Sequence, residues 1–157
     1  MMRVMFLSGL LAFVLDQASK YHALLVLDLE RLGTLPIYPP YLVYQMAWNR
    51  GVNFGLFGSD AQTTRWVLVV LGLVICLWVI QWVRKEVLAR RAVISAGLLV
   101  GGALGNVADR VIHGAVIDFL NMSCCGIQNP FSFNVADVFV FAGAFGLVLF
   151  AGSKNTP

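Results

Sequence analysis

The stretch WVLVVLGLVICLWVIQWV, residues 66–83, decides the fold class of this sequence. Gln81 is its only polar side chain. Apolar helices of about 17–25 residues can cross the hydrocarbon core of a bilayer, which is about 30 Å thick. The stretch therefore predicts a transmembrane helix.

The composition of the whole chain indicates the same class. Of its 157 residues, 59% are hydrophobic and 12% are charged, and the mean hydropathy is +0.81. Soluble domains average about 45–50% apolar and about 25% charged residues. We therefore expect an integral membrane protein that folds as one domain over residues 1–157.

Three further segments complete a prediction of four membrane-spanning helices. The third is rich in glycine and alanine and becomes polar only near its end, in GNVADRV. The first begins with an uncharged run that is too short to span alone and must continue through DQASKYHALL. The predicted fold class is an all-α membrane protein with spans at about 4–24, 66–83, 92–112 and 133–152.

The first segment has a second interpretation as a cleavable signal peptide. Arg3 precedes the apolar run 4–15, which is the order of charges and apolar residues that such peptides show. Asp16 and Gln17, however, stand where the small residues of a cleavage site belong. We therefore expect this segment to be retained as a helix.

The basic residues predict the orientation of the chain. Cytoplasmic connections are enriched in Lys and Arg, and the short connection 84–91, RKEVLARR, carries four of them. Arg3 and Lys154 place both termini on the same side. The net charge of +3 is explained by this orientation, so we expect no binding of nucleic acid.

The long connections, about 25–64 and 113–132, then lie outside the membrane. The first contains prolines, an alternating aromatic stretch and several glycines, a pattern typical of short strands and turns. We expect a small external β-sheet between the first two helices. Its aromatic residues are either a cover for a site or interfacial anchors: Trp48, Phe54 and Phe57.

Two polar clusters lie on predicted helices. Asp16 and Lys20 are spaced i, i+4 on the first helix, and the two can neutralise one another. Asn106, Asp109 and Arg110 share one face of the third helix. Buried ions in membranes usually pair, so both clusters favour structural support between helices.

Asp118 and Asp137 differ because neither has a basic residue near it in the sequence. Asp118 follows the third helix, and Asp137 lies in the first turn of the fourth, where Asn134 is a good N-cap. The connection between these helices is long enough to bring the two carboxyl groups together. The alternative is that the two residues are unrelated: Asp137 is then a carboxylate at the N-terminus of a helix, and Asp118 is a carboxylate in a loop.

If the two carboxyl groups meet in a poorly hydrated site, they cannot both ionise easily. One then keeps a proton while the other can accept one from water, which is the chemistry of an aspartic protease. Cys124 and Cys125 are adjacent and so cannot supply the spaced ligands that zinc requires. We expect no metal and no cofactor.

Five blocks in this order resemble the lipoprotein signal peptidase family, also called signal peptidase II. They are DQASK (16–20), WNRGVNFGLF (48–57), GGALGNVADR (101–110), VIDFL (116–120) and FNVAD (133–137). The family's members are bacterial four-span aspartic proteases.

The resemblance implies that Asp118 and Asp137 are the catalytic pair. Supporting or substrate-binding roles are implied for Asn106, Asp109, Arg110, Asn134, Asp16, Lys20 and Asn49. The implied substrate is a prolipoprotein with a diacylglyceryl-modified cysteine, cut on the N-terminal side of that cysteine. The implied location is the bacterial inner membrane, with the site at the outer face, in contact with membrane lipids, and a monomer suffices.

Two function classes compete with this one. A small proton-linked carrier would use Asp109, Asp118 and Asp137 as a relay and would require acidic groups through the depth of the membrane. A structural subunit would use the polar clusters only to hold helices together.

Overall fold

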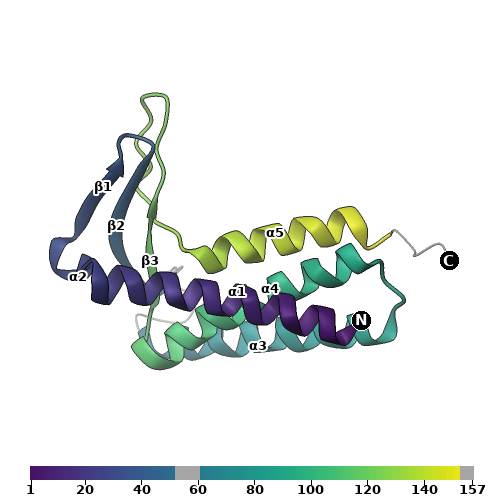
Figure 1. Ribbon diagram of the computed structural model, residues 1–157. Helices are drawn as coiled ribbons and strands as arrows, with labels where there is room; N and C mark the ends of the chain where they lie inside the picture. Colours follow the sequence, from purple (N-terminus) through teal and green to yellow (C-terminus); the bar gives the residue numbers. More distant parts are fainter. Residues whose placement is uncertain (52–60, 153–157) are drawn as a thin grey trace.

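The computed structural model describes residues 1–51 and 61–152. Four long helices run side by side, and a small sheet stands at one end of them (Figure 1). The helices are α1 (Met2–Tyr21), which continues as the π-helical turn η1 (His22–Val26), then α2 (Leu29–Leu32), α3 (Ala61–Lys85), α4 (Arg90–His113) and α5 (Val135–Phe150). The strands are β1 (Thr34–Tyr38), β2 (Leu42–Asn49) and β3 (Val116–Asn121).

Three helical segments of the described residues are long and apolar enough to cross a membrane: Met2–Val26, Gln62–Lys85 and Arg90–His113. They lie within a few residues of the first three predicted spans, so the prediction of a mostly helical membrane protein is confirmed. The fourth predicted segment forms α5, an apolar helix of 16 residues that is shorter than the other three. A fourth crossing stays a prediction.

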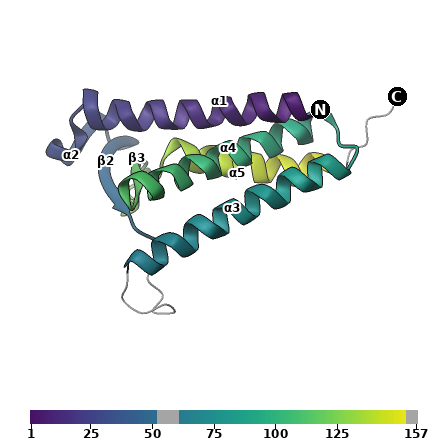
Figure 2. The same ribbon diagram turned by 90° about the horizontal axis from the view of Figure 1, so that it is seen from below.

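Helix α4 is the centre of the bundle, because α1, α3 and α5 all pack against it (Figure 2). Its glycines allow this close packing. A Cβ atom at Gly101 would lie 2.1 Å from the carbonyl oxygen of Gly9 in α1, and one at Gly102 would lie 2.5 Å from that of Ala136 in α5. The Gly- and Ala-rich sequence of the third span therefore has a steric reason.

Replacing Gly101 with alanine is expected to destabilise the protein, because the new methyl group meets backbone and cannot be accommodated by rotating a side chain. Overpacking of this kind costs roughly 1–3 kcal/mol. Thermal unfolding in detergent micelles measures the change. Gly152→Ala is the matched control, since nothing lies within 4 Å of the added atom there; equal stability of both variants would refute close α1–α4 contact.

The sheet is antiparallel with strand order β1-β2-β3. The predicted sheet between the first two helices is correct for β1 and β2. It is incomplete, because β3 comes from the connection between α4 and α5 and places Asp118 in a strand and not in a loop. Four consecutive residues of β3 are buried, 116–119. A strand buried on both faces lacks the alternation of polar and apolar residues by which strands are identified in a sequence.

Each face of β3 is covered by a different part of the protein. Ile117 and Phe119 pack with Ala23 of η1 and Leu29 of α2, beyond the C-terminal end of α1. Asp118 lies opposite Ala47 in the register with β2 and points to the other face, where α4 and α5 lie. The alternation of β3 therefore aims the Asp118 carboxyl group into the junction of sheet and helices.

Candidate active site

A buried ion cluster ties α1 to α4. Lys20 Nζ lies 2.7 Å from Asp16 Oδ2 and 2.7 Å from Asp109 Oδ2, and all three side chains are almost completely buried. Lys20 Nζ also donates to Asn106 Oδ1 at 3.2 Å. The sequence predicted the Asp16–Lys20 pair but not the bridge from Lys20 to the third helix.

The same carboxylates hold the two elements that carry Asp118 and Asp137. Asp16 Oδ1 accepts a hydrogen bond of 2.8 Å from the backbone N–H of Ala136, in the first turn of α5. Asp109 Oδ2 accepts one of 3.2 Å from the backbone N–H of Ile117, in β3. Gly105 leaves room for this arrangement, since a Cβ there would lie 2.4 Å from Asp16 Oδ2.

Gln17 belongs to this cluster, and sequence reasoning missed it. Its Nε2 donates to Asp109 Oδ1 at 2.9 Å and to Asp16 Oδ2 at 3.1 Å. The available signal was its position inside a predicted span, because a polar side chain there requires a partner.

Asn134 is the N-cap of α5, as predicted. Its side-chain oxygen accepts from the backbone N–H of Asp137 at 2.9 Å, and its own N–H donates to Asp137 Oδ2 at 3.2 Å. This reciprocal pair is a capping box. It fixes the Asp137 side chain against the start of the helix.

Asn134 also connects the two aspartates. Its Nδ2 donates to Asp118 Oδ1 at 2.6 Å and to Asn106 Oδ1 at 3.1 Å. Asn106 Nδ2 in turn donates to Asp137 Oδ1 at 2.8 Å. The structure thus brings Asp118 and Asp137 to one shared asparagine, Asn134, although the two residues come from a strand and from a helix.

The two carboxyl groups differ in their surroundings. Asp118 is 2% exposed and accepts a hydrogen bond of 3.0 Å from Asn49 Nδ2. Burial raises the pKa of Asp118 to about 6, and the nearby charge of Asp137 acts in the same direction against the amides of Asn49 and Asn134. Asp137 is only partly buried. Asp118 is therefore the member of the pair that is suited to keep a proton.

Arg110 does not pair with Asp109, contrary to the simplest interpretation of their adjacency. Its guanidinium donates to the backbone oxygen of Asn106 at 3.2 Å. Its Nε is buried and finds no hydrogen-bond partner within residues 1–51 and 61–152. A buried unsatisfied donor of this kind is costly unless a ligand or water meets it.

An apolar groove of about 580 Å³ begins at Asp137 and follows α5. Phe141 and Phe145 in its wall are 79% and 60% exposed. Such large exposed aromatic side chains are suited to contact with lipid or with an apolar ligand. The groove is lined by Phe133, Asp137, Val138, Phe141, Ala142 and Phe145.

Other candidates from the sequence lie elsewhere. Cys124 and Cys125 are exposed in the turn beyond β3. Within the described part of the chain, no group of three or more His, Cys, Asp or Glu side chains is placed to hold a metal ion. Phe54 and Phe57, expected as part of a cover, lie outside the described residues.

Comparison with known proteins agrees with the five sequence blocks. The family described as "Signal peptidase (SPase) II" matches residues 9–152. The lipoprotein signal peptidase of Methylorubrum extorquens (strain PA1) is 38% identical over 148 residues, which cover 92% of this chain and 85% of that protein. That of Methylobacterium radiotolerans is 40% identical over 148 residues, with the same coverage of 92% and 85%.

The fold also matches a solved structure, a bacterial membrane enzyme determined by the in meso method at 1.9 Å resolution. The TM-score is 0.78 at 25% sequence identity, over 97% of this chain and 94% of that one. By sequence over nearly its whole length, and by fold, this chain belongs to the signal peptidase II family.

Proposed function

We propose that this chain is a membrane-embedded aspartic endopeptidase that removes the signal peptide from diacylglyceryl-modified prolipoproteins. The cut falls on the N-terminal side of the lipidated cysteine. One observation carries the proposal: Asn134 binds both carboxyl groups, through Nδ2 to Asp118 and through its backbone N–H to Asp137. Relatives named lipoprotein signal peptidase support the substrate class.

The reaction follows from one proton shared by two carboxyl groups. Ionised Asp137 takes a proton from water while the water oxygen attacks the scissile carbonyl carbon. Protonated Asp118 gives its proton to the carbonyl oxygen. In the second step Asp137 protonates the leaving nitrogen as the C–N bond breaks, and Asp118 recovers a proton from the hydroxyl group of the intermediate.

The apolar groove supports a substrate that remains in the bilayer. Moving acyl chains into water costs about 0.8 kcal/mol per CH₂. A groove that begins at Asp137 and is walled by exposed phenylalanines allows an apolar part of the substrate to stay in lipid while its polar bond reaches the carboxyl groups.

The charge and length of the segments support a placement in the membrane. The basic connection with Arg84, Lys85, Arg90 and Arg91 lies at the end of the bundle opposite to the sheet (Figure 1). We propose that this end is cytoplasmic, that both termini lie there, and that α5 forms a fourth crossing. The site then lies at the outer face of the inner membrane, and a monomer contains all of its parts.

Cleavage of a lipid-modified peptide precursor by the purified chain tests the proposal. An unlipidated twin of the same peptide is the matched control. The expected result is cleavage of the lipidated form before the modified cysteine. Absence of cleavage of the lipidated form would favour a carrier or a structural subunit. Of these two, the carrier fits the structure less well, because a relay needs acidic groups across the membrane. The acidic residues gather instead at one end of the bundle: Asp16, Asp109, Asp118 and Asp137.

The activity should fall as the pH rises. Since the pKa of Asp118 is raised to about 6, its carboxyl group keeps a proton below that pH and loses it above. The active form requires that proton, so kcat/KM, which reports the free enzyme, should decrease through a midpoint near this value. A kcat/KM that increases through the same range would assign Asp118 the role of base.

A further inference from the structure

A second pocket lies at the outer end of α4, away from the two carboxyl groups. Successive residues of a strand point to opposite faces. Asn49 binds Asp118, whereas Trp48, its neighbour in β2, lies opposite Ile117 and points to the other face of the sheet. The pocket is lined by Trp48, Arg50, Gln62, His113, Gly114 and Ala115 and has a volume of about 350 Å³.

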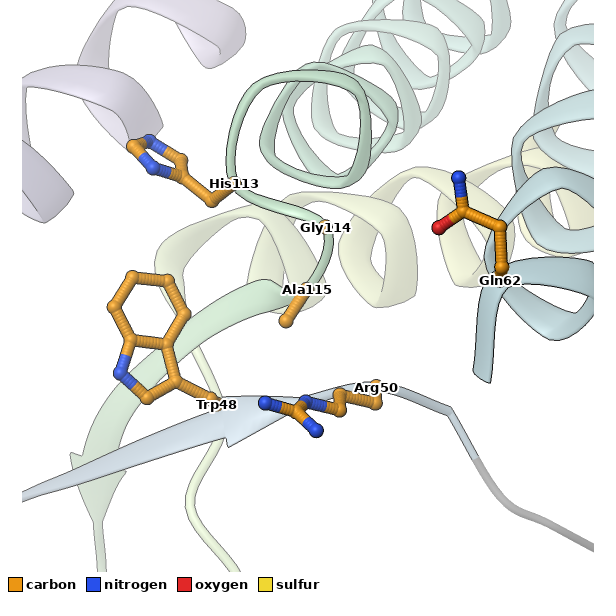
Figure 3. A pocket seen from close by; sticks show the side chains of 6 residues that line it. All are labelled: Trp48, Arg50, Gln62, His113, Gly114 and Ala115. Atoms are coloured by element: carbon orange, nitrogen blue, oxygen red, sulfur yellow. The ribbon is translucent and has the colours of Figure 1, made fainter. Parts of the chain in front are cut away.

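Figure 3 shows how its side chains lie. The indole of Trp48 and the imidazole of His113 are neighbours, with ring centroids 5.8 Å apart and ring planes tilted by 50°. The guanidinium of Arg50 extends toward the side of Ala115 on which the two rings lie. Gln62 lies on the opposite side of Ala115. Aromatic surface and cationic or N–H donor groups therefore surround one space.

The charge of this pocket is positive and is not balanced within the described chain. Arg50 is exposed and forms no hydrogen bond or ion pair there, whereas Lys20 and Arg31 are both paired. Arg65, next to Gly114, donates to the backbone oxygen of Val111 at 2.8 Å. Its Nε is buried without a partner among residues 1–51 and 61–152.

The pocket lies at the ends of two helices that can span a membrane, where lipid headgroups are expected. It is formed where α3 begins and α4 ends, and both are long and apolar enough to span a membrane. Trp66, in the first turns of α3, is 46% exposed and carries the Arg65 guanidinium 5.0 Å above its ring. Tryptophan and arginine at helix ends are typical of the membrane–water interface.

We propose that this pocket binds the phosphate of an anionic phospholipid of the outer leaflet. An arginine fork matches a phosphate oxygen pair, and the Trp48 ring offers apolar surface to the glycerol and the first methylene groups. Occupancy would anchor the sheet end of the protein at the headgroup level. The inference requires a membrane location and does not depend on peptidase activity.

Native mass spectrometry of the purified chain in non-ionic detergent tests the inference. The probes are phosphatidylglycerol, phosphatidylcholine and sodium phosphate. We expect tighter binding of phosphatidylglycerol, weakened about fivefold by Arg50→Gln, which is the usual contribution of one basic residue near a membrane surface. Arg50→Lys keeps the charge and should retain most of the affinity.

Arg31→Gln is the matched control, because it removes one external cation that is already paired with Asp28. It should leave phosphatidylglycerol binding unchanged. Equal affinity of the wild type and Arg50→Gln for phosphatidylglycerol would overturn the inference. Arg50-dependent binding of sodium phosphate, with displacement of the lipid, would also overturn it in favour of a site for free phosphate. Because the measurement reads binding and not cleavage, its failure would leave the proposed peptidase activity untouched.

Discussion

Asp118→Asn and Asp137→Asn are each expected to reduce cleavage of a lipid-modified precursor by about 10³-fold or more, as removal of a positioned acid or base does. Asparagine has the size of aspartate but neither accepts nor releases a proton at neutral pH. The loss should appear in kcat, measured by the release of the signal peptide. Both variants should remain inserted in the membrane.

The local hydrogen bonds predict how well each variant folds. Asn134 and Asn49 each donate an N–H to one carboxylate oxygen of Asp118. In Asp118→Asn one of these oxygens becomes an NH₂ group, so one of the two asparagine donors meets another donor and loses its hydrogen bond. One such unmade hydrogen bond costs about 1–3 kcal/mol, and thermal unfolding in micelles will measure it. The same measurement shows whether the variant is folded, and so separates loss of the fold from loss of the reaction.

Asp28→Asn is the matched control for both variants. Asp28 is an exposed carboxylate whose partner is Arg31, and it takes no part in the hydrogen bonds around Asn134. The control should cleave at the wild-type rate. If either Asp118→Asn or Asp137→Asn also cleaves at that rate while folded, the aspartic mechanism is wrong.

Lys20→Met is expected to cause the second large effect, on stability. Lys20 is 1% exposed and lies between the carboxylates of Asp16 and Asp109. Methionine would leave these two groups buried without their cation, and removal of one partner of a buried ion pair typically costs about 3–5 kcal/mol. Thermal unfolding in detergent micelles measures the change.

The substitution Lys20→Met should also disturb the candidate active site, because Asp16 binds the first turn of α5 and Asp109 binds β3. The exposed Asp28–Arg31 pair gives the control: Arg31→Gln should change stability little, as exposed ion pairs contribute little. An unfolding temperature of Lys20→Met equal to that of the control would contradict the buried network.

The sequence predicts the long helices well because their signal is local. An apolar run such as 66–83 has few alternatives to a membrane helix, and α3 extends it by only a few residues at each end. The N-cap at Asn134 is equally local, since the capping residue and its partner Asp137 are three positions apart. The structure confirms both.

The sequence does not predict contacts that join distant segments. The bridge from Lys20 to Asp109 joins two helices, and spacing along one helix suggested only the Asp16–Lys20 pair. The pairing of β3 with β2 likewise joins two connections that are far apart in the sequence, the one between α1 and α3 and the one between α4 and α5. The start of α5 was placed two residues early for the same reason, because Phe133 pairs with Leu120 of β3 and does not belong to the helix.

The role of Asn134 is the part of the site that spacing alone could not show. The sequence accounts for Asn134 as an N-cap of α5. Its Nδ2 also donates to Asp118, which lies in β3, earlier in the chain and in a different element. One asparagine therefore fixes the separation of the two carboxyl groups. In the proposed reaction, this shared partner would allow residues from a strand and a helix to act on one bond.

The protonation of Asp118 is the property on which the proposed reaction depends. The ¹³C NMR signal of its γ-carboxyl carbon can be followed with pH in the purified chain with labelled aspartate, and Asp118→Asn identifies the signal. We predict a midpoint near a pKa of about 6, shifted downward in Asp137→Asn because the neighbouring charge is removed. A midpoint near the ordinary value of about 3.9, unchanged by Asp137→Asn, would contradict a shared proton.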